Sequence, residues 1–234
     1  FGRDVPAGGA HLAIAYRGKL DAVETEGLFR QKDGEDWYVF SQFESTFARR
    51  AFPCFDEPLY RTPWQLTLHV KEGNVAVSNA PVVASRPEAN GMKAVELAPT
   101  KPISSYLAQT LARLLSVPFT IVDAGTWGRA KTPVRMVVAK GKEGMTGYAS
   151  EVTGPLLAAL EEYFEIPYPF GKLDNLAIPQ TVGFGAMENP GCITFRDTLI
   201  FTSRVTRSER INRATTIAHE MAHQWFGNLT TPVW

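Results

Sequence analysis

The sequence has little of what stabilises a small secreted scaffold or anchors a protein in a membrane. It contains two cysteines, Cys54 and Cys192, in 234 residues. Two are too few for a disulfide framework, and we expect both to be buried free thiols. No apolar run approaches the roughly eighteen residues of a membrane span. Basic and acidic residues balance at 24 each, so no net charge attracts nucleic acid or an anionic membrane.

The sequence also lacks a signal-peptide pattern, an internal repeat and a low-complexity tract. It begins at Phe1 rather than methionine, and we expect the natural start to lie upstream. The absence of a targeting segment therefore leaves the compartment open. What remains is a globular chain with an ordinary apolar content of 44% and no sign of a nucleic-acid partner or membrane segment.

The first part of the chain is dominated by short alternating apolar and polar runs separated by turn residues. Such runs predict β-strands, and many of them at close spacing favour an antiparallel sandwich or saddle-shaped sheet. The predicted strands are 11–16, 37–40, 65–70, 75–77, 95–97, 106–110 and 134–138.

The pattern changes near Ala139, where a polar, glycine-rich joint at 140–144 precedes a helical periodicity over 148–164. Pro155 lies inside that run and should kink the helix or mark its start. Short strands are predicted at 172–178, 192–195 and 198–201, before a second helix. We therefore predict an α+β protein with an N-terminal β-domain over 1–139 and a second domain over 140–234.

That second helix carries the pattern His219-Glu220-Met221-Ala222-His223. Residues four apart lie one turn apart on the same face of a helix, so both imidazoles can reach one metal ion. Zinc prefers such nitrogen ligands, and Glu220 can reach a zinc-bound water without being a ligand itself. A carboxylate in that place can take a proton from the water and deliver it to a leaving amine.

The residues around the motif support a helix there. Thr206-Arg207-Ser208-Glu209 reads as a capping box at the start, and Gly227 supplies a stop. Apolar or small residues recur between them at helical spacing. The histidines therefore lie inside a well-defined predicted helix rather than in a loop.

A second motif, Gly183-Phe184-Gly185-Ala186-Met187-Glu188-Asn189-Pro190-Gly191, precedes that helix. Its glycines allow a ligand to approach the backbone, and a strand edge here can pair with an extended peptide. The Glu188 carboxylate can bind a free amino group through charge-assisted hydrogen bonds. Taken alone, the stretch also fits a glycine-rich turn with a solvated glutamate.

Together these motifs resemble the aminopeptidase N family of zinc exopeptidases. The resemblance rests on Gly185-Ala186-Met187-Glu188-Asn189, on His219 to Leu229, and on the earlier stretches 42–46 and 49–58. It extends from about residue 10 to the end of the chain. It implies a β-saddle domain followed by the first part of a thermolysin-like zinc peptidase domain.

By position, the resemblance implies a role for each motif residue. His219 and His223 correspond to ligands of Zn²⁺, and Glu220 to the general base and acid. Glu188 corresponds to the residue that holds the α-ammonium of a peptide with a free N-terminus, and Glu44 to a second amine-binding residue from the β-domain. The residues that correspond to backbone and side-chain contacts with the peptide are Gly185, Ala186 and Met187. The peptide bond between Glu44 and Ser45 is expected to be cis.

The resemblance also implies parts that this sequence does not contain. Family members have a third zinc ligand, a glutamate, whose position counted from His223 falls past Trp234. We expect that glutamate, and the rest of the catalytic machinery, in a missing C-terminal portion of the same polypeptide. We therefore expect the isolated segment to bind zinc weakly and to be inactive, while the parent is a zinc metallo-aminopeptidase.

Other functions share part of this pattern. A thermolysin-type zinc endopeptidase would have the same helix, but it would not need the amine-binding carboxylates Glu188 and Glu44. A non-catalytic peptide-binding protein could retain the site without turnover, although Glu220 is present. A bifunctional epoxide hydrolase of the same family is a further alternative.

Overall fold

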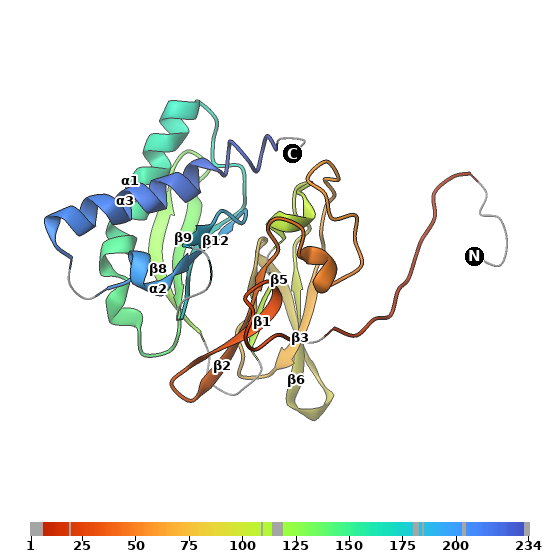
Figure 1. Ribbon diagram of the computed structural model, residues 1–234. Coiled ribbons are helices and arrows are strands. Elements are labelled where there is room, and N and C mark those ends of the chain that lie inside the picture. Colours follow the sequence, from red (N-terminus) through yellow and green to blue (C-terminus); the bar gives the residue numbers. More distant parts are fainter. Residues whose placement is uncertain are drawn as a thin grey trace.

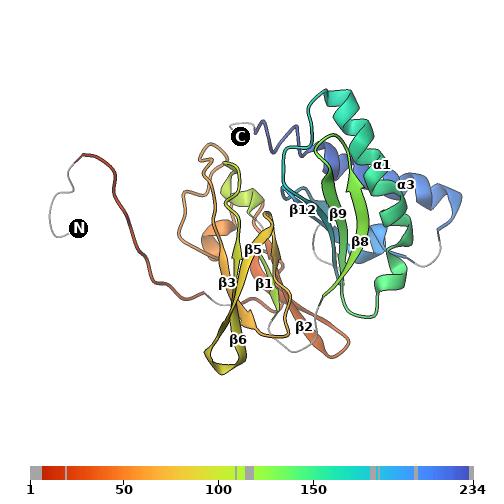
Figure 2. The ribbon, with the colours of Figure 1, turned by 180° about the vertical axis from the view of Figure 1, so that it is seen from behind.

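The computed structural model describes residues 7–18, 20–108, 110–113, 119–179, 183, 185–202 and 205–231. The chain forms two lobes that lie side by side (Figure 1). The N-terminal lobe consists of strands, and the second lobe has a sheet with helices on one face. The same two lobes are seen from behind in Figure 2.

The N-terminal lobe contains two antiparallel sheets. In one, β1 (Gly27–Asp33) and β2 (Asp36–Gln42) form a hairpin. That sheet has the order β1-β2-β7-β4, with β7 at Thr110–Arg113 and β4 at Val77–Ser78. The other has the order β3-β6-β5, from β3 (Thr67–Lys71), β6 (Met92–Leu97) and β5 (Val82–Glu88). The predicted antiparallel β-domain is thus present.

The second lobe is built on a five-stranded sheet of order β11-β12-β10-β9-β8. Its central strands β9, β10 and β12 run parallel, whereas β8 and β11 are antiparallel to their neighbours. The bounds of these strands are β8 Thr120–Trp127, β9 Thr132–Val138, β10 Leu173–Ile178, β11 Ala186–Met187 and β12 Cys192–Arg196.

Three α-helices accompany this sheet: α1 (Gly147–Phe164), α2 (Asp197–Ile200) and α3 (Arg207–Ala222). Both α1 and α3 cover the face of the sheet that points away from the N-terminal lobe (Figures 1 and 2). Their apolar side chains form one core with the sheet, which includes Leu157, Ile217 and Met221. Pro155 lies inside α1, which continues through it. Single turns of 3₁₀ helix occur at Ala48–Arg50, Ala89–Gly91, Ser105–Leu107 and Glu143–Met145.

The opposite face of the sheet packs against the N-terminal lobe. Phe29 and Phe40 of that lobe share a core with Leu176 and Ile178 of β10. Every residue of β10 is buried, because one face meets the helices and the other meets the N-terminal sheet. The contact between the lobes therefore includes a hydrophobic core.

Three predicted strands are wrong. Residues 11–16 form no strand, although they alternate as expected, and Leu12, Ile14 and Tyr16 are exposed. Within 106–110, Tyr106 and Leu107 belong to a 3₁₀ turn, and residue 109 lies outside the described residues. Residues 198–201 fall mostly in the short helix α2. Alternation alone does not make a strand, because a strand also needs a partner for its backbone groups.

The position of the domain boundary stays a prediction. The strands β8 and β9 precede residue 139 but lie in the same sheet as β10 and β12. In the described part of the chain, no helix combines the length and apolar character that crossing a membrane requires. Cys54 and Cys192 are free thiols, and Cys192 is buried whereas Cys54 is half-buried.

Candidate active site

Helix α3 carries His219 in its last turn, and His223 is its C-cap, so the helix ends before the predicted stop at Gly227. The predicted capping box is present: Thr206 accepts a hydrogen bond from the Glu209 backbone N–H, and the Glu209 carboxylate accepts from the Thr206 backbone N–H. At the other end of the helix the rings of His219 and His223 lie edge to face, with centroids 4.9 Å apart. Two imidazoles at this separation on one helix face can converge on a single ion.

The tautomer of His223 leaves one nitrogen free for a metal. Its Nδ1 lies 3.1 Å from the carbonyl oxygen of Phe226, which can only accept, so Nδ1 carries the hydrogen. In the neutral ring Nε2 then has the free lone pair. Gly227 permits this return of the chain, since its φ is +126° and an added Cβ would lie 3.1 Å from Nδ1. A backbone carbonyl that fixes the outer nitrogen is the usual support of a metal-binding histidine.

Glu220 is held in a different environment from an ordinary surface glutamate. The residue is only 8% exposed. Burial raises the pKa of its carboxyl to about 8, with further contributions from the carboxylates of Glu188 and Glu44. A carboxyl with such a pKa can both take up and release a proton near neutrality.

Glu188 follows β11, whose free edge borders the same site. Among the described residues β11 is the terminal strand of this sheet, and it pairs with β12 through Ala186 and Met187. The Gly185 carbonyl accepts from the backbone N–H of Arg196, which continues the ladder. An edge strand has backbone groups that can pair with an extended peptide, and that pairing stays a prediction here.

Glu44 reaches the site from the other lobe, at the turn after β2. Partial burial raises the pKa of its carboxyl, as does the nearby Glu188 carboxylate, whereas His223 lowers it. The structure therefore brings Glu44, Glu188 and Glu220 within electrostatic reach of one another, although they are far apart in the sequence. The peptide bond between Glu44 and Ser45 is cis, as predicted.

Met187 occupies a different environment from the other motif residues. It is buried with Ile103 and Leu107, and its sulfur accepts a hydrogen bond from Gln42 Nε2 at 3.6 Å. The side chain thus joins the two lobes at the back of the site. Its predicted contact with a peptide stays a prediction.

Tyr106, Gln224 and Asn228 also contribute to the site, although no role for them was predicted from the sequence. Burial raises the pKa of the Tyr106 hydroxyl, as do Glu188 and Glu44, so this side chain borders the carboxylates. Gln224 and Asn228 donate to the Glu188 carbonyl at 2.8 and 2.7 Å. No local pattern marks Tyr106. Gln224 and Asn228 lie within five residues after the histidine motif, and this proximity was the one signal that could have identified them.

The donor set fits a zinc ion but is incomplete within the part of the chain described. Two imidazoles on one face, one with its outer nitrogen fixed, are what zinc binds. Across the described ranges, no group of three or more His, Cys, Asp or Glu side chains is arranged to hold a metal. The further ligand expected elsewhere in the polypeptide stays a prediction.

Comparisons with known proteins bear on this geometry. Residues 4–107 match the Peptidase M1 N-terminal domain, and residues 148–234 match the Peptidase family M1 domain. Aminopeptidase M1-A of Oryza sativa subsp. japonica is 39% identical over 241 residues, which cover 100% of this chain and 26% of the relative. Endoplasmic reticulum aminopeptidase 1 of Homo sapiens is 39% identical over 229 residues, 95% of this chain and 24% of the relative.

A third relative, Leucyl aminopeptidase of Saccharolobus solfataricus, is 35% identical over 227 residues, 95% of this chain and 27% of the relative. The chain thus spans about a quarter of the length of the curated relatives it matches. The matched domains occur in the same order as the two lobes of the structure. The chain therefore belongs to the M1 peptidase family, a family of hydrolases that act on peptide bonds.

Proposed function

We propose that the protein containing this chain is a zinc metallo-aminopeptidase, which removes residues from peptides with a free N-terminus. The observation that carries the proposal is the gathering of Glu44, Glu188 and Glu220 beside His219 and His223. Carboxylates this close repel one another, and burial makes the ionisation of Glu44 and Glu220 costly. A dication at the histidines and an ammonium at Glu188 and Glu44 would neutralise them.

His219 and His223 would hold the zinc, together with the further ligand expected in the polypeptide. When bound, zinc supplies a Lewis acid that polarises a water and the scissile carbonyl. Glu220 takes the proton of the attacking water and returns it to the leaving amine, a use that suits its raised pKa. The edge of β11 orients the peptide backbone through Gly185 and Ala186.

The two other carboxylates account for selection of the N-terminus. Glu188 and Glu44 approach from different lobes, so a charged amine can lie between them. An internal peptide bond would bring a neutral amide instead, and the carboxylates would be desolvated without a partner. This distinguishes the proposed activity from that of a thermolysin-type endopeptidase, which has no use for these groups.

The test is a cleavage assay with the full-length protein. We expect a peptide with a free N-terminus to be shortened from that end, and its N-acetylated version to be resistant. Chelation of the metal should abolish cleavage, and Glu220→Gln should lower kcat by about 10²-fold or more. Cleavage of the acetylated peptide at an internal bond would show an endopeptidase, and full activity of Glu220→Gln would contradict the assigned base.

A further inference from the structure

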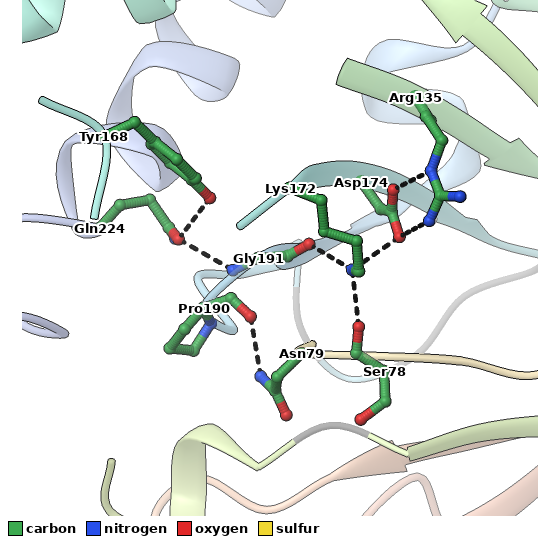
Figure 3. A network of polar contacts seen from close by, with 9 residues as sticks. All are labelled: Ser78, Asn79, Arg135, Tyr168, Lys172, Asp174, Pro190, Gly191 and Gln224. Carbon is green, nitrogen blue, oxygen red and sulfur yellow. Dashed lines mark hydrogen bonds and ion pairs between the residues drawn. The ribbon is translucent and has the colours of Figure 1, made fainter. Parts of the chain in front are cut away.

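The backbone that carries Glu188 is held by buried side chains from three separate parts of the chain. Residues 188–191 follow the edge strand β11 and have no regular secondary structure of their own. The carbonyl groups of Glu188, Pro190 and Gly191 accept hydrogen bonds from neighbouring side chains, several of which appear in Figure 3. A short irregular segment keeps a fixed place in a protein only when its polar groups are satisfied.

The first of these parts is the stretch that follows helix α3, which ends at Ala222. Gln224 Nε2 and Asn228 Nδ2 both donate to the Glu188 carbonyl, at 2.8 and 2.7 Å. Gln224 Oε1 accepts from the Gly191 backbone N–H and from the Tyr168 hydroxyl, both at 3.2 Å (Figure 3). Both amide side chains are fully buried. Gln224 follows His223 directly, so the stretch just after helix α3 holds both ends of the 188–191 segment.

The other two parts fix the far side of the segment. Asn79 of the N-terminal lobe donates to the Pro190 carbonyl at 2.9 Å, and Lys172 donates to the Gly191 carbonyl at 2.8 Å. Gly191 has a φ of +70°, and a Cβ there would overlap with the carbonyl oxygen of Asn79. The segment therefore cannot move toward the N-terminal lobe, and its distance from α3 depends on Gln224 and Asn228.

We propose that Gln224 and Asn228 are positioning residues that set the distance between the Glu188 carboxylate and the metal-binding histidines. This inference rests on the proposed function. In an aminopeptidase the amine and the scissile carbonyl belong to the same residue, so the groups that hold them must keep a constant separation. A displacement of about 1 Å can cost about 10²-fold in rate. Two hydrogen bonds from the stretch that directly follows helix α3 provide such a fixed reference.

The experiment uses the full-length protein and two ligands, a dipeptide amide with a free α-amine and the same compound without that amine. Their inhibition constants are compared in wild type, Gln224→Met, Asn228→Ala and the double variant. Methionine keeps the volume of Gln224 but cannot form its hydrogen bonds. We expect the preference for the amine to fall about three- to tenfold in each single variant. The double variant should lose more of this preference than the product of the two single fold-losses, because each donor partly compensates for loss of the other.

The matched control is Asn175→Ala. Asn175 is also fully buried, and its Nδ2 donates one hydrogen bond, to Thr153 Oγ1 at 2.9 Å beneath α1. It should lose stability as Asn228→Ala does, yet keep the wild-type preference for the amine. An inhibition constant does not depend on the fraction of folded enzyme, so loss of stability alone cannot imitate the effect. An unchanged preference in Gln224→Met and Asn228→Ala would overturn the proposal.

A second measurement separates this proposal from the function on which it rests. Hydrogen exchange of the Gly191 amide, which donates to Gln224, is followed in the same variants. Faster exchange in Gln224→Met but not in Asn175→Ala supports the positioning role, even if wild type shows no preference for the amine and the proposed function fails. Equal exchange in wild type and Gln224→Met overturns it.

Discussion

Replacing Lys172 by methionine should destabilise the protein more than the same replacement of Arg135, the other cation that pairs with Asp174. Lys172 has a side chain that is 5% exposed, and its Nζ donates to the Asp174 carboxylate and the Ser78 carbonyl at 2.7 Å, and to the Gly191 carbonyl at 2.8 Å (Figure 3). All three ammonium hydrogens thus have an acceptor. These acceptors belong to both lobes, since Ser78 lies in β4.

The size of the effect follows from these contacts. Removing one partner of a buried ion pair costs about 3–5 kcal/mol. Methionine retains the apolar stem, so little packing is lost, but two carbonyl groups lose their donor at about 1–3 kcal/mol each. Arg135 still binds Asp174 through two hydrogen bonds at 2.7 and 2.8 Å, which offsets part of the loss. We therefore expect Lys172→Met to lower the free energy of unfolding by about 3–5 kcal/mol.

Urea unfolding followed by tryptophan fluorescence measures this change, with Arg135→Met as the matched variant. The Arg135 side chain is 32% exposed, so water can partly replace it, and we expect a loss of about 1–3 kcal/mol. A loss below about 1 kcal/mol for Lys172→Met, or a larger loss for Arg135→Met, would refute this reasoning.

Acid unfolding gives an independent check on the same ion pair. Burial acts to raise the pKa of Asp174, but Lys172 and Arg135 outweigh it and hold the pKa below its ordinary value of 3.8. The stabilisation is therefore complete above pH 3.8 and is lost as pH falls through the lower folded pKa. Lys172→Met weakens the depression, so its acid unfolding midpoint should move to higher pH.

Three further predictions concern helix packing, proton binding and metal binding. Gly154→Ala should lower the melting temperature measured by circular dichroism, because the added methyl group overlaps with the Trp127 ring. Overpacking costs about 1–3 kcal/mol, which exceeds the gain in helix propensity of about 1 kcal/mol. A higher melting temperature would contradict the close packing. Glu220→Gln should stabilise the metal-free chain at pH 8 by at least about 1.4 kcal/mol in urea unfolding. Because the pKa of the Glu220 carboxyl is raised to about 8 in the folded protein, the wild-type protein loses stability as pH rises above 4.5. The difference between wild type and variant should therefore vanish below pH 4.5. In calorimetric titration this chain should bind zinc more than tenfold more weakly than one extended through the expected third ligand, because His219 and His223 are its only predicted ligands; equal affinity would show that two histidines suffice.

Local sequence signals predicted the histidine helix well. The capping box fixes the start of α3, and the side chains that pack into the core follow helical spacing. The pattern His219-Glu220-Met221-Ala222-His223 lies at the end of this helix. The placement of the two histidines one turn apart therefore followed from their spacing in the sequence. The prediction succeeded because propensity, capping and burial all favour the same structure there.

Short apolar runs were harder to assign. Residues 198–201 have strand-like side chains, but the preceding Asp197 begins α2 and binds Lys142 at 3.1 Å. Residues 11–16 alternate like a strand and yet have no strand partner in the structure. In both cases tertiary contacts, which the local pattern does not contain, decide the conformation.

The contacts that hold the site together could not be predicted from local patterns. Arg135 and Asp174 meet because β9 and β10 pair in register, and Asn79 reaches Pro190 across 111 positions of sequence. Neither pair has a periodicity or a spacing that marks it. Such contacts follow from the sheet order, and only the family resemblance carried information about that order.

The arrangement of the lobes bears directly on the proposed selection of a free amine. Glu44 belongs to the N-terminal lobe, whereas Glu188 follows the edge strand of the second lobe, so the space for an ammonium depends on how the lobes meet. Arg61 of the N-terminal lobe donates to the carbonyls of Asn228 and Leu229, at 3.0 and 3.1 Å, just beyond the histidine helix. The same residue, Asn228, holds the Glu188 carbonyl. One chain of hydrogen bonds therefore links the N-terminal lobe, the histidine helix and the amine-binding segment, and a change in the contact between the lobes should alter amine selection as well as stability.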